Sequence, residues 1–293
     1  MATHPQNVLI LGGLGMLAQA VRRSLVRRGV EPSVADREEA DVTDAGQVMA
    51  LLEQHRPQVV YNCAAYTAVD KAEQEPAVAD AVNGHAVGHV ADACKKVGAR
   101  LVHVSTDFVF DGTATEPYLT TETPNPVSAY GRSKLLGERK LVESGLQDYA
   151  IVRTAWLYGP GGNNFVKTMV TLARKGTDLK IVDDQQGGPT FTHDLADALL
   201  NLTEANATGT YHVTNAGRTT WHGLTEEAMR VFSIDHPIGR QSAADYAKLK
   251  PDAAIRPAFS ALDLTAYEKA TGKTMRDWRE ALRDYHTVTA GEG

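Results

Sequence analysis

The stretch VLILGGLGMLAQA, residues 8–20, decides the fold prediction. Its first four residues, Val8–Leu11, are apolar like a buried strand, and a glycine turn then leads into a helical pattern that extends to about Arg28. Gly12 and Gly15 would let the backbone turn tightly and approach a pyrophosphate, to which the first turn of the helix would offer unpaired N–H groups. An ordinary turn between a strand and a helix is the alternative interpretation.

The same alternation of strand and helix continues along the chain. Continuous apolar strands between helices favour an α/β fold, namely a Rossmann-type doubly wound parallel sheet whose strands have their carboxyl ends on one edge. Further strands are predicted at 32–35, 58–61, 100–104 and 149–153, and helices at 45–55, 76–97 and 128–144.

Beyond residue 156 the pattern changes, because stretches rich in Gly and Pro interrupt shorter elements. We therefore predict an NAD(P)-binding Rossmann domain over residues 1–155 and a mainly substrate-binding, smaller C-terminal lobe over residues 156–293. Elements near 190–235 are expected to join the first domain.

Composition excludes several classes of function. The 293 residues carry a net charge of −6, which gives no basic surface for nucleic acid. No apolar run approaches the roughly 20 residues that a membrane helix needs, and the first residues lack a signal-peptide pattern. The two cysteines, Cys63 and Cys94, provide no disulfide framework. We expect a cytoplasmic protein with neither a membrane nor a nucleic-acid partner.

Two residues after the second strand bear on the choice of cofactor. Asp36 follows Gly12 by some 24 residues, where a carboxylate can hold the adenosine ribose of a dinucleotide. Arg37 comes next, and its guanidinium could accept a 2′-phosphate instead. The sequence thus predicts NADPH or NADH and leaves the choice between them open.

A tyrosine and a lysine provide a candidate catalytic pair. Tyr130 and Lys134 are four residues apart at the start of a predicted helix, so they share a helix face. A free phenol titrates near pH 10, and a neighbouring cation is expected to lower this pKa. Ser105, Thr106 and Asp107 follow the strand at 100–104, where they would reach the same edge of the sheet. A surface helix with an unrelated Tyr and Lys is the alternative.

Together these features resemble the extended short-chain dehydrogenase/reductase superfamily and, within it, the dTDP-4-dehydrorhamnose reductase family. The resemblance extends over nearly the whole chain. The segments that carry it include NCAAYTAVDKAE (62–73), VHVSTDFVFDG (102–112), YGRSKLLGE (130–138), RTAWLYG (153–159) and DDQQGGPT (183–190).

The resemblance implies that a reduced nicotinamide delivers hydride to the C4 ketone of a nucleotide-linked 6-deoxy-4-ketohexose. Tyr130 would donate the proton, Lys134 would bind the nicotinamide ribose and Thr106 would bind the substrate oxygen. The residues implied to bind the cofactor are Gly12, Gly15, Met16, Leu17, Asp36, Arg37, Asp41, Val42, Ala64, Ala65 and Tyr66, with Tyr130 and Lys134. Those implied to bind the nucleotide sugar are Thr106, Asp107, Phe108, Tyr130, Trp156, Asn164, Lys167 and Arg256.

Departures from the family pattern keep alternatives open. Phe259 replaces an Asn in the family's RPxNS stretch. This difference leaves open a 4-ketoreductase that acts on another nucleotide-linked deoxysugar. Ala20 stands where some members have a glutamate that binds magnesium at a dimer interface, so we predict no metal site and leave a homodimer open. His85 and His89 lack the acidic partner of an HExxH motif. A non-catalytic regulatory subunit that binds nucleotides is a further alternative.

Overall fold

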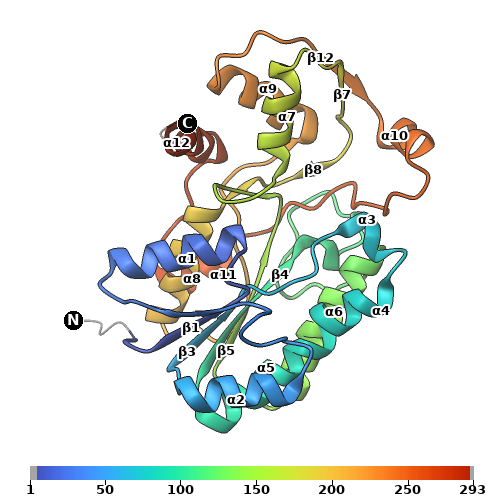
Figure 1. Cartoon of the computed structure of the whole chain (residues 1–293). Coiled ribbons are helices and arrows are strands. Elements are labelled where there is room, and N and C mark those ends of the chain that lie inside the picture. Colours follow the sequence, from blue (N-terminus) through green and yellow to red (C-terminus); the bar gives the residue numbers. More distant parts are fainter. Residues whose placement is uncertain (1–4, 291–293) are drawn as a thin grey trace.

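The computed structural model of the chain describes residues 5–290 (Figure 1). Within these residues the main sheet has six parallel strands, in the spatial order β10-β5-β4-β3-β1-β2. The strands are β1 Val8–Leu11, β2 Ser33–Ala35, β3 Val59–Asn62, β4 Arg100–Thr106, β5 Tyr149–Thr154 and β10 Gly209–His212. The predicted Rossmann-type parallel sheet is thereby confirmed.

Helices cover both faces of this sheet, which explains why its strands are apolar throughout. One face packs under α1 Met16–Arg27, α8 Thr192–Glu204 and α11 Thr265–Thr271. The other packs under α2 Ala45–His55, α5 Ala86–Val97 and α6 Ala129–Glu143. Val8 and Ile10 belong to the first core, whereas Leu9 and Leu11 belong to the second, as the alternation of side chains along a strand requires.

The order of the strands places the ligand-binding edge. β1 lies between β2 and β3, so chain order reverses there, and a crevice opens at such a point beyond the carboxyl ends of the strands. The glycine turn follows β1 directly at this edge. Gly12 and Gly13 both donate their N–H groups to the carbonyl of Ala35 at the end of β2, which holds the turn against the sheet.

The helix predicted at 76–97 differs from the prediction in its middle. It consists of α4 Pro76–Ala79, a π-helical turn Asp80–His85 and α5, without a break. The amide of Asn83 in the π-turn bonds to the backbone N–H and carbonyl of Tyr66 and to the hydroxyl of Ser133 on α6. The widened turn therefore brings Asn83 between the loop after β3 and α6.

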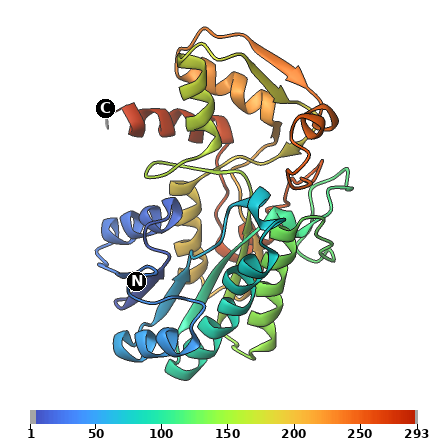
Figure 2. The same cartoon turned by 45° about the vertical axis from the view of Figure 1, so that its right-hand side comes forward.

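A smaller lobe lies above the carboxyl edge of the sheet (Figure 2). Its own apolar core joins α7 Phe165–Arg174, α9 Trp221–Val231, α12 Trp278–Ala290, β7 Leu179–Val182 and β12 Ile238–Gln241. The chain enters this lobe after β5, returns to the sheet through α8 and β10, and enters the lobe again at α9. The remaining short elements are α3 Val69–Ala72, a 3₁₀ turn Asp107–Val109, β6 Leu157–Tyr158, β8 Gln186–Gly187, β9 Thr190–Phe191, β11 Thr219–Thr220 and α10 Ala243–Leu249. Across residues 5–290, no helix has both the length and the apolar character needed to cross a membrane.

Candidate active site

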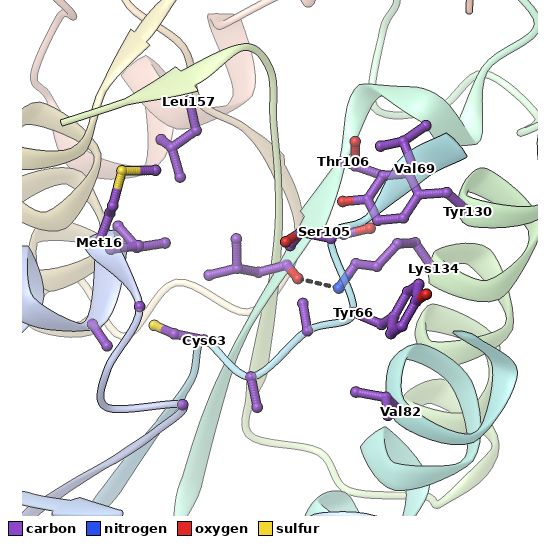
Figure 3. Close-up of a pocket in the computed structure, with 18 of the residues that line it drawn as sticks. Met16, Cys63, Tyr66, Val69, Val82, Ser105, Thr106, Tyr130, Lys134 and Leu157 are labelled. Carbon is purple, nitrogen blue, oxygen red and sulfur yellow. Dashed lines mark hydrogen bonds between the residues drawn. The ribbon is translucent and has the colours of Figure 1, made fainter. Parts of the chain in front are cut away.

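A cavity of about 1080 Å³ lies between the carboxyl edge of the sheet and the smaller lobe. Its walls come from both parts of the molecule, and Figure 3 shows the residues around its centre. Most of the residues predicted from the sequence line it. These are Gly12, Gly15, Met16, Leu17, Asp36, Arg37, Asp41, Val42, Ala64, Ala65, Tyr66, Thr106, Asp107, Phe108, Tyr130, Lys134, Trp156 and Arg256.

The glycine turn fits a dinucleotide at one end of the cavity. Gly12 has φ +77°, and a Cβ at this residue would lie 2.7 Å from the backbone of Ala64, so a side chain has no room there. Gly15 precedes α1 without a side-chain cap, which leaves the N–H groups of the first helical turn available to an anion. The donor set therefore suits a pyrophosphate.

The carboxylate of Asp36 organises this turn. It accepts the backbone N–H of Leu14 at 2.7 Å through one oxygen and that of Arg37 at 2.7 Å through the other. The Arg37 side chain is 85% exposed and donates to Asp41 at 3.2 Å. An anionic group at the rim of the cavity can thus reach the guanidinium without displacing buried structure.

The start of α6 presents Tyr130 and Lys134 to the cavity. The Ser128 hydroxyl accepts the N–H of Gly131, and Glu73 accepts that of Ala129, so side chains satisfy the first turn of the helix. A Cβ at Gly131 would lie 2.1 Å from the carbonyl oxygen of Phe108, so this glycine permits the close contact between α6 and the turn after β4. The Phe108 and Tyr130 rings meet edge to face, with centroids 5.5 Å apart.

The Lys134 side chain crosses beneath the tyrosine. Lys134 is 2% exposed, and its ammonium group donates to the carbonyl of Val104 at 2.7 Å (Figure 3). Burial lowers the pKa of Lys134 to about 8, against the opposing effect of the Glu138 carboxylate. The lysine is therefore mostly charged at neutral pH.

The pKa of Tyr130 shifts in the opposite direction from the prediction. Burial, together with the Asp107 carboxylate, raises it to about 12, against the opposing effect of the Thr106 hydroxyl. The expected lowering of this pKa by Lys134 is not seen in this structure, where desolvation of the phenol determines the direction of the shift. At neutral pH the phenol keeps its proton, and this is the form that can act as a proton donor.

The strand that precedes this site is longer than predicted. β4 continues through Ser105 and Thr106, and Asp107 follows it, with all three residues buried rather than emerging at its end. Thr106 donates to Asp107 at 2.9 Å, while Ser105 donates to Glu138 on α6. Burial raises the pKa of Asp107 to about 6, even though hydrogen bonds from Ser260 and Thr106 lower it.

The far wall of the cavity is aromatic. Trp156 and Trp221 both line it and stack face to face, and Trp221 is a lining residue that the sequence analysis did not identify. Cys63 is half-buried and also lines the cavity. Arg256 lies on the same lining and donates to Asp70 at 2.8 Å.

Two residues predicted to bind the nucleotide sugar do not line the cavity. Asn164 begins α7 as its N-cap: its amide oxygen accepts the N–H of Lys167, and its amide nitrogen donates to the carbonyl of Gly159. The Lys167 side chain is exposed on α7. Phe259, which had raised the alternative of another sugar, packs in a small core with Tyr118 and is absent from the lining.

Within residues 5–290, no three side chains of His, Cys, Asp or Glu lie close enough together to hold a metal ion. His85 belongs to the π-turn, and His89 approaches the carbonyl of Val42 at 3.4 Å.

A parallel sheet with a glycine turn after its first strand, and a Tyr–Lys pair at the opposite side of the same cavity, define the class of extended short-chain dehydrogenases/reductases. Residues 6–290 match the model of one family, described as the RmlD substrate binding domain. The chain belongs to this family, and the predicted resemblance is confirmed.

Individual relatives agree with this assignment. A dTDP-4-dehydrorhamnose reductase of Streptomyces griseus is 42% identical over 99% of this chain and 97% of its own length. Two solved structures of dTDP-4-dehydrorhamnose reductases are also similar. That from Clostridium acetobutylicum has a TM-score of 0.92 at 38% identity, and covers 97% of this chain and 99% of the other. That from Bacillus anthracis, in complex with NADP, has a TM-score of 0.91 at 34% identity, and covers 98% and 99%.

Proposed function

We propose that the chain reduces the C4 ketone of dTDP-4-dehydro-L-rhamnose to give dTDP-L-rhamnose, with NADPH or NADH as the reductant. The observation that carries this proposal is the convergence of Tyr130, Lys134 and Thr106 in the cavity that also contains the glycine turn. The names of the full-length relatives support the choice of ketosugar.

The dinucleotide, when bound, supplies the hydride for the carbonyl carbon. Tyr130 holds its proton at neutral pH because burial raises its pKa, so it is ready to donate that proton to the oxygen of the ketone. The buried ammonium of Lys134 then stabilises the phenolate that remains. Thr106 lies beside Tyr130 and positions the same oxygen (Figure 3).

Binding is divided between the two parts of the cavity. The glycine turn and the residues at the ends of β2 and β3 hold the dinucleotide, because they combine backbone donors with a close approach. Trp156 and Arg256 take the nucleotide sugar, since an indole can stack on a base or sugar and a guanidinium can pair with a diphosphate. Asp107 and Phe108 shape the pocket around the ketone.

The proposed location is the cytoplasm. Cys63 and Cys94 are free thiols, as is typical of proteins in a reducing compartment.

The experiment is a steady-state assay of the purified protein with dTDP-4-dehydro-L-rhamnose and each reduced nicotinamide. We expect oxidation of the cofactor together with formation of dTDP-L-rhamnose. A panel of other nucleotide-linked 4-keto-deoxysugars tests the substrate. If another member of the panel is turned over faster, it would replace dTDP-4-dehydro-L-rhamnose as the proposed substrate. Absence of turnover with every member would refute the reductase function.

A further inference from the structure

A buried ion pair lies next to the catalytic residues on α6. The side chains of Glu138 and Arg153 are each 6% exposed. Arg153 donates to both carboxylate oxygens, through Nε at 2.9 Å and Nη2 at 2.7 Å, and the hydroxyl of Ser105 adds a third bond at 2.6 Å. Such forked, charge-assisted contacts fix both side chains in orientation as well as distance.

These contacts connect three elements that make up the site. Tyr130, Lys134 and Glu138 are spaced by four residues on α6 and so occupy one face of the helix. Ser105 on β4 and Arg153 on β5 are register partners. Thr106 and Thr154, which come next in these two strands, are also register partners, and both line the cavity. Glu138 therefore fastens the catalytic helix to two adjacent strand ends at the level where the cavity begins.

The charges around Lys134 give this carboxylate a second effect. Lys134 and Glu138 are one helical turn apart on α6, and the Glu138 carboxylate and the Cys63 thiol both raise the pKa of the ammonium, which in turn lowers the pKa of His103 on β4. Burial raises the pKa of the Cys63 thiol to about 12 and lowers that of His103 well below its usual value, so both are neutral. Among these neighbours, the negative charge that favours the Lys134 cation comes from Glu138.

Arg153 is the other cation of the cluster. It faces Glu138, the ring of Phe110 at 5.2 Å and Nε2 of His212 on β10 at 3.4 Å. Burial and the guanidinium lower the pKa of His212 to about 3, so this imidazole is neutral as well. Glu138 thus stands between two buried cations, one that it binds directly and one that it influences through space.

We propose that Glu138 is a positioning residue of the reductase: its carboxylate, clamped by Ser105 and Arg153, holds α6 against the strand ends and keeps the Lys134 ammonium charged for the reaction. The proposal rests on the reductase function proposed above, because it concerns the state of Lys134 during that reaction. A purely structural ion pair would stabilise the fold without setting the charge of the lysine.

The test compares Glu138→Gln with the intact protein over a range of pH. An opposite charge close to a titrating group shifts its pKa by about one unit or more. We therefore expect the alkaline limb of kcat/KM, where Lys134 loses its proton, to move to lower pH by about one unit in this variant. The pKa of Lys134 is also measured in the cofactor-free protein, by NMR of ¹³C-labelled lysine with the signal assigned from Lys134→Arg. The Lys134 pKa measured in this way should be lower in Glu138→Gln than in the intact protein by a similar amount.

A matched control and a second variant separate charge from folding. Glu143→Gln removes an exposed carboxylate from the same helix and should leave the lysine pKa unchanged. Glu138→Gln with Arg153→Gln removes both partners of the buried pair, which costs less stability than leaving one cation unpaired. This double variant should regain part of the loss in Tm, and its lysine pKa should lie between those of Glu138→Gln and the intact protein, because loss of the Arg153 cation also favours the charged lysine.

The outcomes are distinct. A lysine pKa that is unchanged in Glu138→Gln, or that falls as far in Glu143→Gln, would overturn the positioning role. An intact protein that does not turn over any ketosugar would refute the reductase function instead, whatever the NMR titration gives.

Discussion

The indole rings of Trp156 and Trp221 lie parallel, with 3.6 Å between their centroids and 10° between their planes. A Cβ on Gly187 would lie 2.5 Å from the Trp156 indole, so the absence of a side chain at Gly187 leaves room for this ring. Trp156 also has φ +46°, a backbone conformation that costs energy for a residue with a side chain. Trp221 thus helps to hold a strained residue whose ring forms a wall of the cavity.

From this stacking we expect Trp221→Ala to weaken binding of the nucleotide sugar. An aromatic pair contributes about 0.5–1.5 kcal/mol beyond its buried area, so KM for the ketosugar should rise roughly 3- to 10-fold. The Kd for NADPH should change little, because Trp221 belongs to α9 of the smaller lobe, whereas the glycine turn follows β1 of the sheet. Trp221→Phe keeps an aromatic plane and should retain most of the affinity; equal losses in both variants would contradict a stacking role.

Tyr130→Phe should remove the proton donor without altering the shape of the cavity. General acid catalysis is typically worth about 10²–10⁴-fold, so kcat should fall within that range. Binding of NADPH, measured by quenching of protein fluorescence, should stay close to that of the intact protein. Turnover near the original rate would show that another group supplies the proton.

Gly12→Ala should abolish tight binding of the cofactor, because its Cβ would overlap the backbone of Ala64. Gly29 provides a matched control: it has φ +78°, and a Cβ there would meet nothing within 4 Å. Gly29→Ala should lose about 1–2 kcal/mol of stability to the left-handed conformation, and Gly12→Ala should lose more because its Cβ also meets the backbone of Ala64. Calorimetric titration with NADPH should detect weaker binding in Gly12→Ala alone, and a comparable loss in Gly29→Ala would attribute the effect to destabilisation.

Arg37→Gln should discriminate between the two cofactors. A hydrogen bond to a charged group contributes about 1.5–3 kcal/mol when it is shielded from solvent. Because the Arg37 side chain is exposed, we expect a contribution at the lower end of this range, and KM for NADPH should rise about 10-fold. KM for NADH, which has no 2′-phosphate, should be unaffected. Equal changes for both cofactors would place the guanidinium away from that phosphate.

Asp107→Asn should make the stability of the protein less dependent on pH. The pKa of this buried carboxyl is raised from 3.8 to about 6, so the folded state binds its proton more tightly than the unfolded state does. Stability therefore declines as pH rises from about 4 to about 6. Above pH 6 the variant should gain about 1–3 kcal/mol in the free energy of unfolding, and below pH 4 it should gain little. Urea titrations at pH 4 and pH 8 measure this difference, and an equal gain at both would exclude ionisation as the cause.

The sequence predicts the regular part of the fold well, because apolar runs and glycine turns are local signals. The strand Val8–Leu11 and the helix Ala45–His55 have the predicted bounds. The π-turn at Asp80–His85 was not foreseen, since it depends on bonds from Asn83 to Tyr66 and Ser133, which are distant in sequence. Apolar periodicity does not report such contacts.

For the candidate site too, local sequence signals predict some residues, whereas contacts between distant segments are missed. Residues at strand ends, such as Thr106, line the cavity because topology brings every carboxyl end to one edge. Asn164 does not, because an Asn directly before a helix serves as its N-cap, an alternative that its neighbours in the sequence already favour. The sequence does not reveal the role of Trp221, because its contact with Trp156 joins segments 65 residues apart.

The π-turn also limits how this chain can change in length. Asn83 on the π-turn and Gly137 on α6 are in such close contact that a Cβ at the glycine would lie 2.1 Å from the carbonyl oxygen of Asn83. A π-turn accommodates one extra residue within an α-helix, so deleting one residue between 80 and 85 would let this turn close to an α-helical one. Asn83 would then lose its place between Tyr66 and Ser133. In this segment, residue identities can vary within limits of size, whereas the number of residues is fixed by the contact with the catalytic helix.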